Sequence, residues 1–216
     1  MLRANDRAHA AMADADGQYP FELLPSGASD DAATLLVTAC IAASGEGVLW
    51  RLLDAALPGK KPSAEAVRAA VEADPGAAAR PFATPAGWKP VEGALVRLRP
   101  GLGEKEGLRA GELATVTRVG SDGDIELERN GEELDGWFKP ADLAHGFDGW
   151  LPLHAAAYLA LDKEALSLLL EAHTAAAATA DAGGQYPLHL AASAGADKET
   201  LLLLLEAHTG AAATAH

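Results

Sequence analysis

Aromatic side chains, cysteine and basic side chains are all scarce in this chain of 216 residues. Aromatic residues make up only 5% of the sequence, so its interior has to be filled by small and aliphatic side chains, which suit closely packed helices. Cys40 is the only cysteine, which excludes an internal disulfide framework and a cysteine-rich zinc site. We therefore expect a reducing, intracellular compartment, either cytoplasmic or nuclear.

The shortage of basic residues also restricts the partners that the chain can bind. There are 17 Lys and Arg residues against 31 Asp and Glu residues, a formal net charge of −14. A nucleic-acid binder needs a basic surface for phosphate contacts, and an anionic membrane attracts the same charge. No apolar run approaches the ~20 residues that a membrane span requires. We expect no nucleic-acid partner and no direct membrane binding.

An internal repeat is the strongest pattern that the sequence does contain. The segment Pro152–Ala157 recurs as Pro187–Ala192, 35 residues later. The register continues without a gap, so that residues 171–174, Glu-Ala-His-Thr, match residues 206–209. A fixed period of this length is typical of arrays of stacked structural units.

Each unit predicts two helices joined by a turn. Ala160 or Gly195 ends the short first helix, and Asp162 or Asp197 is a natural N-cap for the second. The second helix carries a broad leucine stripe, such as Leu201–Leu205. Because neither helix can cover its own apolar surface, neighbouring units are expected to stack.

The pattern Gly-x-x-Pro-Leu-His-x-Ala-Ala at 149–157 and 184–192 resembles the start of an ankyrin repeat. The resemblance implies that His154 and His189 have a structural role, bridging backbone groups of adjacent loops. It also implies that a protein partner binds along the loop tips and the first helices. The positions that correspond to this surface are Asp148, Trp150, Tyr158, Leu159, Gln185, Tyr186 and Ser193. For Trp150 an alternative stays open, namely that its side chain fixes the neighbouring insert to the stack.

Two imperfect copies come before the matched pair. Residues 13–23 align with 180–190, and a second copy has a first helix at Val48–Leu57. Its second helix is predicted at Ala64–Ala73, with Ser63 as the N-cap.

Between the copies, residues 81–146 change in character. Apolar and polar residues alternate at 95–99, 113–119 and 125–128, and an Asp-Gly turn separates the last two segments, which predicts a β-hairpin. With the ending Gly-Trp-Phe-Lys-Pro-Ala-Asp-Leu, the segment resembles SH3-like small barrels, in particular the β-modules of Mind bomb/HERC-type ubiquitin-ligase proteins. Trp137 and Phe138 are candidates for a peptide-binding aromatic patch, and the alternative is that one of them belongs to the core. Eight basic against twelve acidic residues also exclude a basic nucleic-acid module.

The sequence offers no catalytic constellation. The acidic residues between Asp122 and Glu133 match the spacing of a calcium loop, but Leu127 stands where that loop requires glycine, so we interpret the segment as a strand. We expect no catalytic residues, no cofactor and no metal site, and therefore no enzyme.

These observations together predict a mainly α fold. We expect an ankyrin-type α-solenoid of about four helix pairs, interrupted by a small SH3-like β-barrel insert. The predicted domains are residues 1–80, 81–146 and 147–216. The expected function is a non-catalytic protein-interaction module or scaffold. The alternatives are the substrate-recognition part of a ubiquitin-ligase assembly, or a structural subunit of a large complex. In either case the apolar Leu201–Leu205 helix is expected to be covered by a continuation of the array or by a partner.

Overall fold

The computed structural model describes residues 36, 47–54, 61–99 and 101–214, which form two compact units. The helical unit contains the described residues up to Arg80, Leu151–Thr179 and Tyr186 onwards. The sheet unit contains Pro81–Trp150 and the short segment Ala180–Gln185. The predicted division at residues 81–146 stays a prediction, and the contacts of the structure also group residues 147–150 and 180–185 with the sheet unit.

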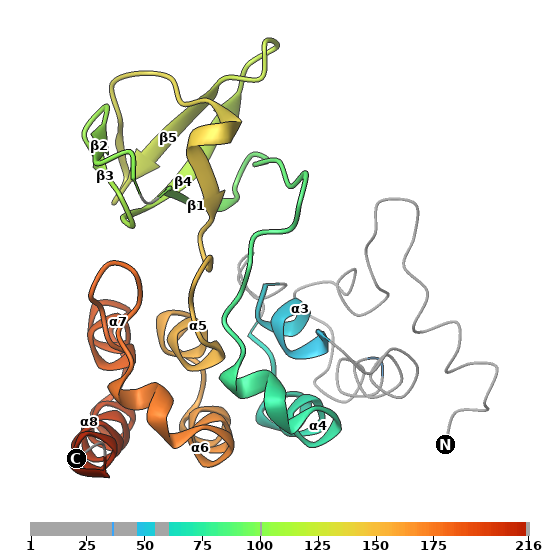
Figure 1. Cartoon of the computed structure of the whole chain (residues 1–216), viewed down its shortest axis with the longest axis vertical. Helices are drawn as coiled ribbons and strands as arrows, with labels where there is room; N and C mark the ends of the chain where they lie inside the picture. Colours follow the sequence, from blue (N-terminus) through green and yellow to red (C-terminus); the bar gives the residue numbers. More distant parts are fainter. Residues whose placement is uncertain (1–35, 37–46, 55–60, 100, 215–216) are drawn as a thin grey trace, which may run out of the picture. The chain divides into compact units, whose positions relative to one another are not determined.

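The helical unit consists of paired helices (Figure 1). The first helices of the pairs are α3 (Val48–Asp54), α5 (Pro152–Tyr158) and α7 (Pro187–Ser193). The second helices are α4 (Ala64–Ala73), α6 (Lys163–Ala172) and α8 (Lys198–Thr214). Helix α5 packs against α3 and α7, and α6 packs against α4 and α8, so first helices contact first helices and second helices contact second helices.

Polar side chains cap the second helices as the sequence predicts. Asp162 Oδ1 accepts a hydrogen bond from the backbone N–H of Ala165 at 2.8 Å, and Ser63 Oγ accepts one from that of Ala66 at 3.3 Å. Both acceptors satisfy an N–H group that the helix itself leaves without a partner. The predicted helix Ala64–Ala73 is confirmed at both ends.

The short first helices end on left-handed residues. Ala160 has φ +49° and the equivalent Gly195 has φ +71°, so both copies use the backbone conformation that usually terminates a helix. Glycine adopts this conformation freely, whereas an alanine is strained in it. The two copies therefore end the first helix with the same left-handed backbone conformation, although only one of them carries glycine.

Alanine-rich segments follow the second helices and form 3₁₀ turns. These turns are η1 (Pro75–Ala79) and η3 (Thr174–Ala178), and each buries two alanine side chains. Alanine has a high helical propensity and its side chain is small enough to be covered completely, so the segment tightens against the neighbouring helices α6 and α8.

The sheet unit is built on one antiparallel sheet with strand order β6-β5-β4-β1-β7. Its strands are β1 (Leu95–Leu98), β4 (Leu113–Val119), β5 (Ile125–Arg129), β6 (Glu132–Glu133) and β7 (Leu143–His145). A separate pair consists of β2 (Glu104–Lys105) and β3 (Leu108–Arg109), and a 3₁₀ turn, η2 (Pro140–Asp142), precedes β7. The predicted hairpin is confirmed as β4 and β5, with Gly123 at φ +86° in the turn between them.

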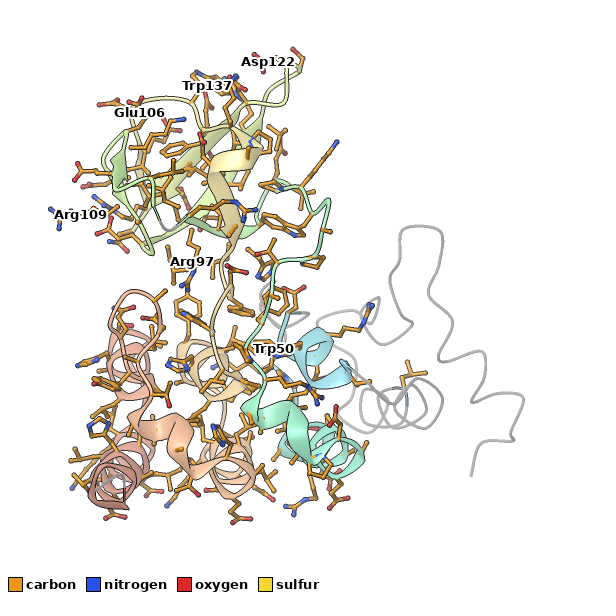
Figure 2. The ribbon with its side chains drawn as sticks, in the orientation of Figure 1. Trp50, Arg97, Glu106, Arg109, Asp122 and Trp137 are labelled. Carbon is orange, nitrogen blue, oxygen red and sulfur yellow. The ribbon has the colours of Figure 1, made fainter. Side chains whose placement is uncertain are left out.

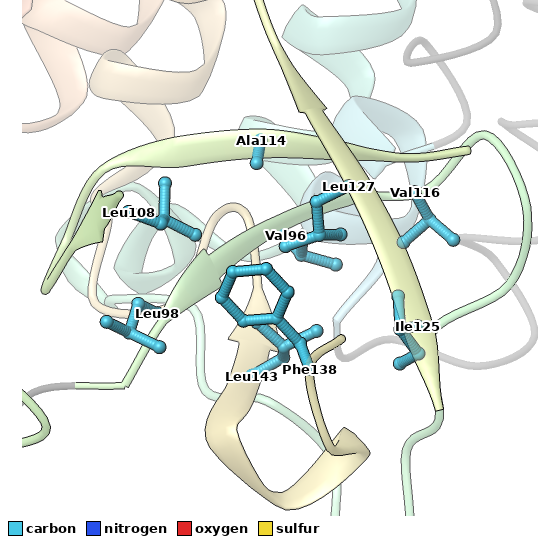
Figure 3. Close-up of a cluster of buried hydrophobic side chains, with 9 residues drawn as sticks. All are labelled: Val96, Leu98, Leu108, Ala114, Val116, Ile125, Leu127, Phe138 and Leu143. Carbon is cyan, nitrogen blue, oxygen red and sulfur yellow. The ribbon is translucent and has the colours of Figure 1, made fainter. Parts of the chain in front are cut away.

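The core of the sheet unit is aliphatic apart from one aromatic ring (Figure 3). Its nine buried side chains are Val96, Leu98, Leu108, Ala114, Val116, Ile125, Leu127, Phe138 and Leu143. Complete burial of a leucine, isoleucine or phenylalanine side chain is worth about 1.5–3 kcal/mol relative to leaving it exposed, so this cluster gives the sheet unit an apolar core of its own.

The predicted fold class is wrong. The chain is not a mainly α, ankyrin-type solenoid of about four helix pairs with a small barrel insert, because the residues that the structure describes form six helices together with a five-stranded and a two-stranded sheet. Helices account for 43% and strands for 17% of the structure, which makes the class mixed. The physical reason is that the alternating segments of the insert pair into an extended sheet with β6 and β7 at its edges and bury their own core. The repeat copy predicted at residues 13–23, like Cys40 and residues 55–57 of the predicted first helix, lies outside the described residues.

Candidate functional site

The residues predicted to bind a partner differ widely in exposure. Trp150 and Phe138 are completely buried. Tyr158, Leu159, Tyr186 and Asp148 are half-buried, and burial raises the pKa of the Tyr158 hydroxyl. The exposed members are Gln185, Ser193 and Trp137. Two of the predicted partner-binding residues, Trp150 and Phe138, are therefore not accessible to a partner.

Trp150 lies at the centre of a buried group in the sheet unit, which we call the Trp150 cluster (Arg97, Phe147, Trp150 and Asp181). The indole Nε1–H of Trp150 donates to Asp181 Oδ2 at 2.7 Å, and its ring stacks on Phe147 with centroids 5.4 Å apart. The Arg97 guanidinium lies over the same ring, 4.9 Å from the centroid. Trp150 therefore has an internal role here and is not available to a partner.

Arg97 and Asp181 form a buried charge pair. Their side chains are 2% and 1% exposed, and Arg97 Nη1 lies 3.8 Å from Asp181 Oδ2. Burial lowers the pKa of Arg97, while the negative charges of Asp181 and Asp148 act in the opposite direction. Arg97 Nε also donates to the backbone carbonyl of Gly146 at 2.8 Å. The guanidinium is thus held by one hydrogen bond, one aromatic ring and one carboxylate.

Asp181 also organises the loop that carries it. Its Oδ1 accepts hydrogen bonds from the backbone N–H groups of Gly183 at 2.9 Å and Gln185 at 2.8 Å. The loop 180–185 is therefore fixed by the same carboxylate that binds Trp150. Sequence reasoning missed both Arg97 and Asp181. The Asp-Ala-Gly-Gly segment is a recognisable turn signal for Asp181, but a single arginine in an alternating strand gives no sign of burial.

The two histidines of the repeats have different environments. His154 is 1% exposed, and its Nε2 lies 3.0 Å from the backbone oxygen of Thr179, at the far end of the same unit. His189 is exposed, and its Nδ1 accepts a hydrogen bond from the backbone N–H of Tyr186 at 3.1 Å. Both rings contact backbone groups. His154 contacts one that lies 25 residues further along the chain, and His189 contacts one at the start of its own helix.

The exposed aromatic residue of the sheet unit is Trp137, whose side chain is 40% exposed while the adjacent Phe138 is in the core. The Arg118 guanidinium lies over its ring, 4.9 Å from the centroid, and also pairs with Glu126 at 2.6 Å. Arg118 and Glu126 face each other on β4 and β5. The indole is therefore held over the end of the hairpin and keeps an accessible surface.

Two glycines near this indole leave room for neighbouring side chains. A β-carbon at Gly120 would lie 3.3 Å from Trp137 Cζ3 and 2.8 Å from Asp122 Oδ1. A β-carbon at Gly136 would lie 2.7 Å from Glu106 Cδ. Figure 2 shows Trp137, Asp122 and Glu106 on the sheet unit. We call this region the Trp137 surface (Glu106, Arg118, Asp122, Glu126 and Trp137).

Acidic groups predominate around Trp137. Lys139 pairs with Asp124 at 2.6 Å, and this hydrogen bond raises the pKa of Lys139. Asp135, two residues before Trp137, is exposed, as are Asp122 and Glu106. Within the described residues no basic side chain pairs with these three carboxylates. The Trp137 surface therefore combines an exposed aromatic ring with an excess of negative charge.

A second exposed apolar feature lies on the helical unit. Leu202 and Leu205 of α8 are 45% and 46% exposed, whereas Leu204 on the same helix is 1% exposed. The stripe of leucines is thus wider than the face that α8 buries against α6 and α7.

Over the described part of the chain, no three His, Cys, Asp or Glu side chains are arranged to hold a metal ion. Among the helices described, none has the length and apolar character needed to cross a membrane. Comparisons with family models, curated proteins and solved structures found no match to this chain.

Proposed function

We propose that this chain is a non-catalytic protein-interaction module and that its partner binds on the Trp137 surface. The observation that carries the proposal is the exposure of the Trp137 indole, because a large aromatic side chain on a rigid support makes a disproportionate contribution to a protein interface. The support is rigid because Phe138, the next residue, is anchored in the core and exchanges two backbone hydrogen bonds with Ile125, both at 2.9 Å.

We also propose that the units starting at Gly149 and Gly184 are related to ankyrin repeats. This is supported by the shared Pro-Leu-His start of α5 and α7 and by the contact of His154 with Thr179. The proposed relation concerns the two helix pairs α5–α6 and α7–α8 and does not extend to the strands.

Differential capture from a native extract tests the interaction. The full chain, Trp137→Ser and Leu102→Ser are immobilised side by side; Leu102 is 45% exposed on the same unit and serves as the matched control. We expect a protein that binds the wild type and the control and is lost with Trp137→Ser. A set of captured proteins that is identical for all three chains would contradict the proposal.

A second candidate function is a structural subunit that docks through α8. The exposed Leu202 and Leu205 favour it, since buried leucine side chains stabilise an interface much as they stabilise a core. The variant Leu202→Ser/Leu205→Ser distinguishes the two. Loss of the captured protein with this variant, and its retention with Trp137→Ser, would favour the structural role. Ubiquitin-ligase components among the captured proteins would point to the ligase alternative.

A further inference from the structure

The exposed ring of Trp137 is already occupied by a cation from its own chain. Arg118 lies 4.9 Å from the ring centroid, and its side chain is 58% exposed. A cation–π contact and an ion pair at such an exposed position each change an equilibrium constant only a few-fold. The guanidinium is therefore held weakly, and an equivalent group from another molecule can replace it.

We infer that the partner presents an arginine in a basic segment, and that its guanidinium takes the place of Arg118 on the Trp137 ring. The inference rests on the proposed function and names the chemistry of the partner. Displacement of Arg118 also releases Glu126, which lies 2.6 Å from Arg118 Nη2. The incoming guanidinium then has a ring to stack on and a carboxylate to bind, which is the pair of contacts that Arg118 itself makes.

Charge complementarity supports a basic segment on both sides of this arginine. Asp122 and the indole both approach Gly120, Glu106 approaches Gly136, the residue before Trp137, and Asp135 precedes Trp137 by two residues. Among the described residues, no basic side chain forms an ion pair with these three carboxylates, and the charge of Lys139 acts on Asp122 only from a greater distance. An acidic or phosphorylated segment would be repelled by the same groups, so the surface selects for positive charge.

Arginine fits the site better than lysine. Its planar guanidinium can stack on an indole and bind a carboxylate through two N–H groups, whereas an ammonium group is compact and more strongly hydrated. The structure holds an arginine and not a lysine against the ring, although Lys139 lies nearby in sequence and pairs with Asp124 instead.

The test is an NMR titration of the full chain, labelled with ¹⁵N at the tryptophan indoles, with a peptide of alternating glycine and arginine. Trp137→Phe assigns the Trp137 indole signal. The key variants are Arg118→Gln and Lys139→Gln, which remove the same charge and each release one carboxylate, while only Arg118→Gln uncovers the ring. We expect the peptide to shift the Trp137 signal and to bind Arg118→Gln about two- to five-fold more tightly than Lys139→Gln.

Equal affinities of the two variants would overturn the inference, as would equally tight binding of a peptide with lysine in place of arginine. A Trp137 signal that does not move at saturating peptide would do the same. If capture of a protein depends on Trp137 but the arginine peptide does not bind, the proposed function stands and the inference is wrong. If the peptide binds as expected but no captured protein depends on Trp137, the proposed function is wrong and the ring merely accepts arginine.

Discussion

Removal of the Asp181 carboxylate tests the buried charge pair most severely. In Asp181→Ala, Arg97 stays in a site where it is 2% exposed and loses the carboxylate 3.8 Å away, and the Trp150 indole loses the oxygen that it binds at 2.7 Å. Breaking a buried ion pair destabilises a protein by about 3–5 kcal/mol, and a buried donor without its acceptor by about 1–3 kcal/mol. Because a single carboxylate serves both groups, we expect a total loss of about 3–5 kcal/mol for the sheet unit.

The double variant Arg97→Met/Asp181→Ala separates charge from packing. Once the guanidinium is also removed, no buried charge lacks a counterion, so the double variant is expected to be more stable than Asp181→Ala alone. Urea unfolding followed by tryptophan fluorescence, together with hydrogen exchange of the β1 amides, measures the stability of the sheet unit. The exposed Asp135→Ala is the control and should change it by less than about 0.5 kcal/mol. A loss below about 1 kcal/mol for Asp181→Ala, or a double variant less stable than the single one, would show that the charge of Arg97 does not depend on Asp181.

Two further predictions concern backbone strain and acid stability. Ala160→Gly should stabilise the helical unit by about 1 kcal/mol because φ at this residue is +49°, and Gly195→Ala, at φ +71°, should destabilise it by a similar amount; thermal unfolding that shows the same sign for both would contradict this. Asp142→Asn should lower the stability at pH 7 by up to about 1 kcal/mol, because the hydrogen bond from Lys105 lowers the pKa of Asp142 in the folded chain. That stabilisation is complete above the ordinary aspartate pKa of about 4 and is lost as the pH falls through the lowered folded value, so the difference between wild type and variant should shrink only below about pH 4.

Local elements were predictable because local signals determine them. The helix Ala64–Ala73 begins after Ser63, whose hydroxyl makes the expected cap, and the Asp-Gly turn joins β4 to β5. Both features depend on residues only a few positions apart, which is the range over which caps and turns operate.

The fold class was not predictable in the same way, since it depends on which distant segments pair. Strand β1 lies between β4 and β7, and β7 begins 45 residues after Leu98. Alternating residues indicate a strand but do not say how many strands join one sheet. The sequence pattern therefore predicted the strands of the insert but not the size of the sheet that they form.

The candidate site shows the same limit. Residues 137 and 138 are neighbours in an extended segment, so their side chains point to opposite sides, and the alternative that one of them belongs to the core was correct for Phe138. For Arg97, alternation placed the side chain on the face opposite the core residues Val96 and Leu98. That face is covered by Trp150 and Asp181, which are 53 and 84 residues away in the chain. A local sequence pattern cannot indicate contacts with residues so far along the chain.

Oxidative footprinting of the chain, alone and in complex with the protein captured through Trp137, shows whether a partner covers this indole. We expect Trp137 to be readily oxidised in the free chain and protected in the complex, and Trp150 to be protected in both. Unchanged oxidation of Trp137 on complex formation would contradict this expectation.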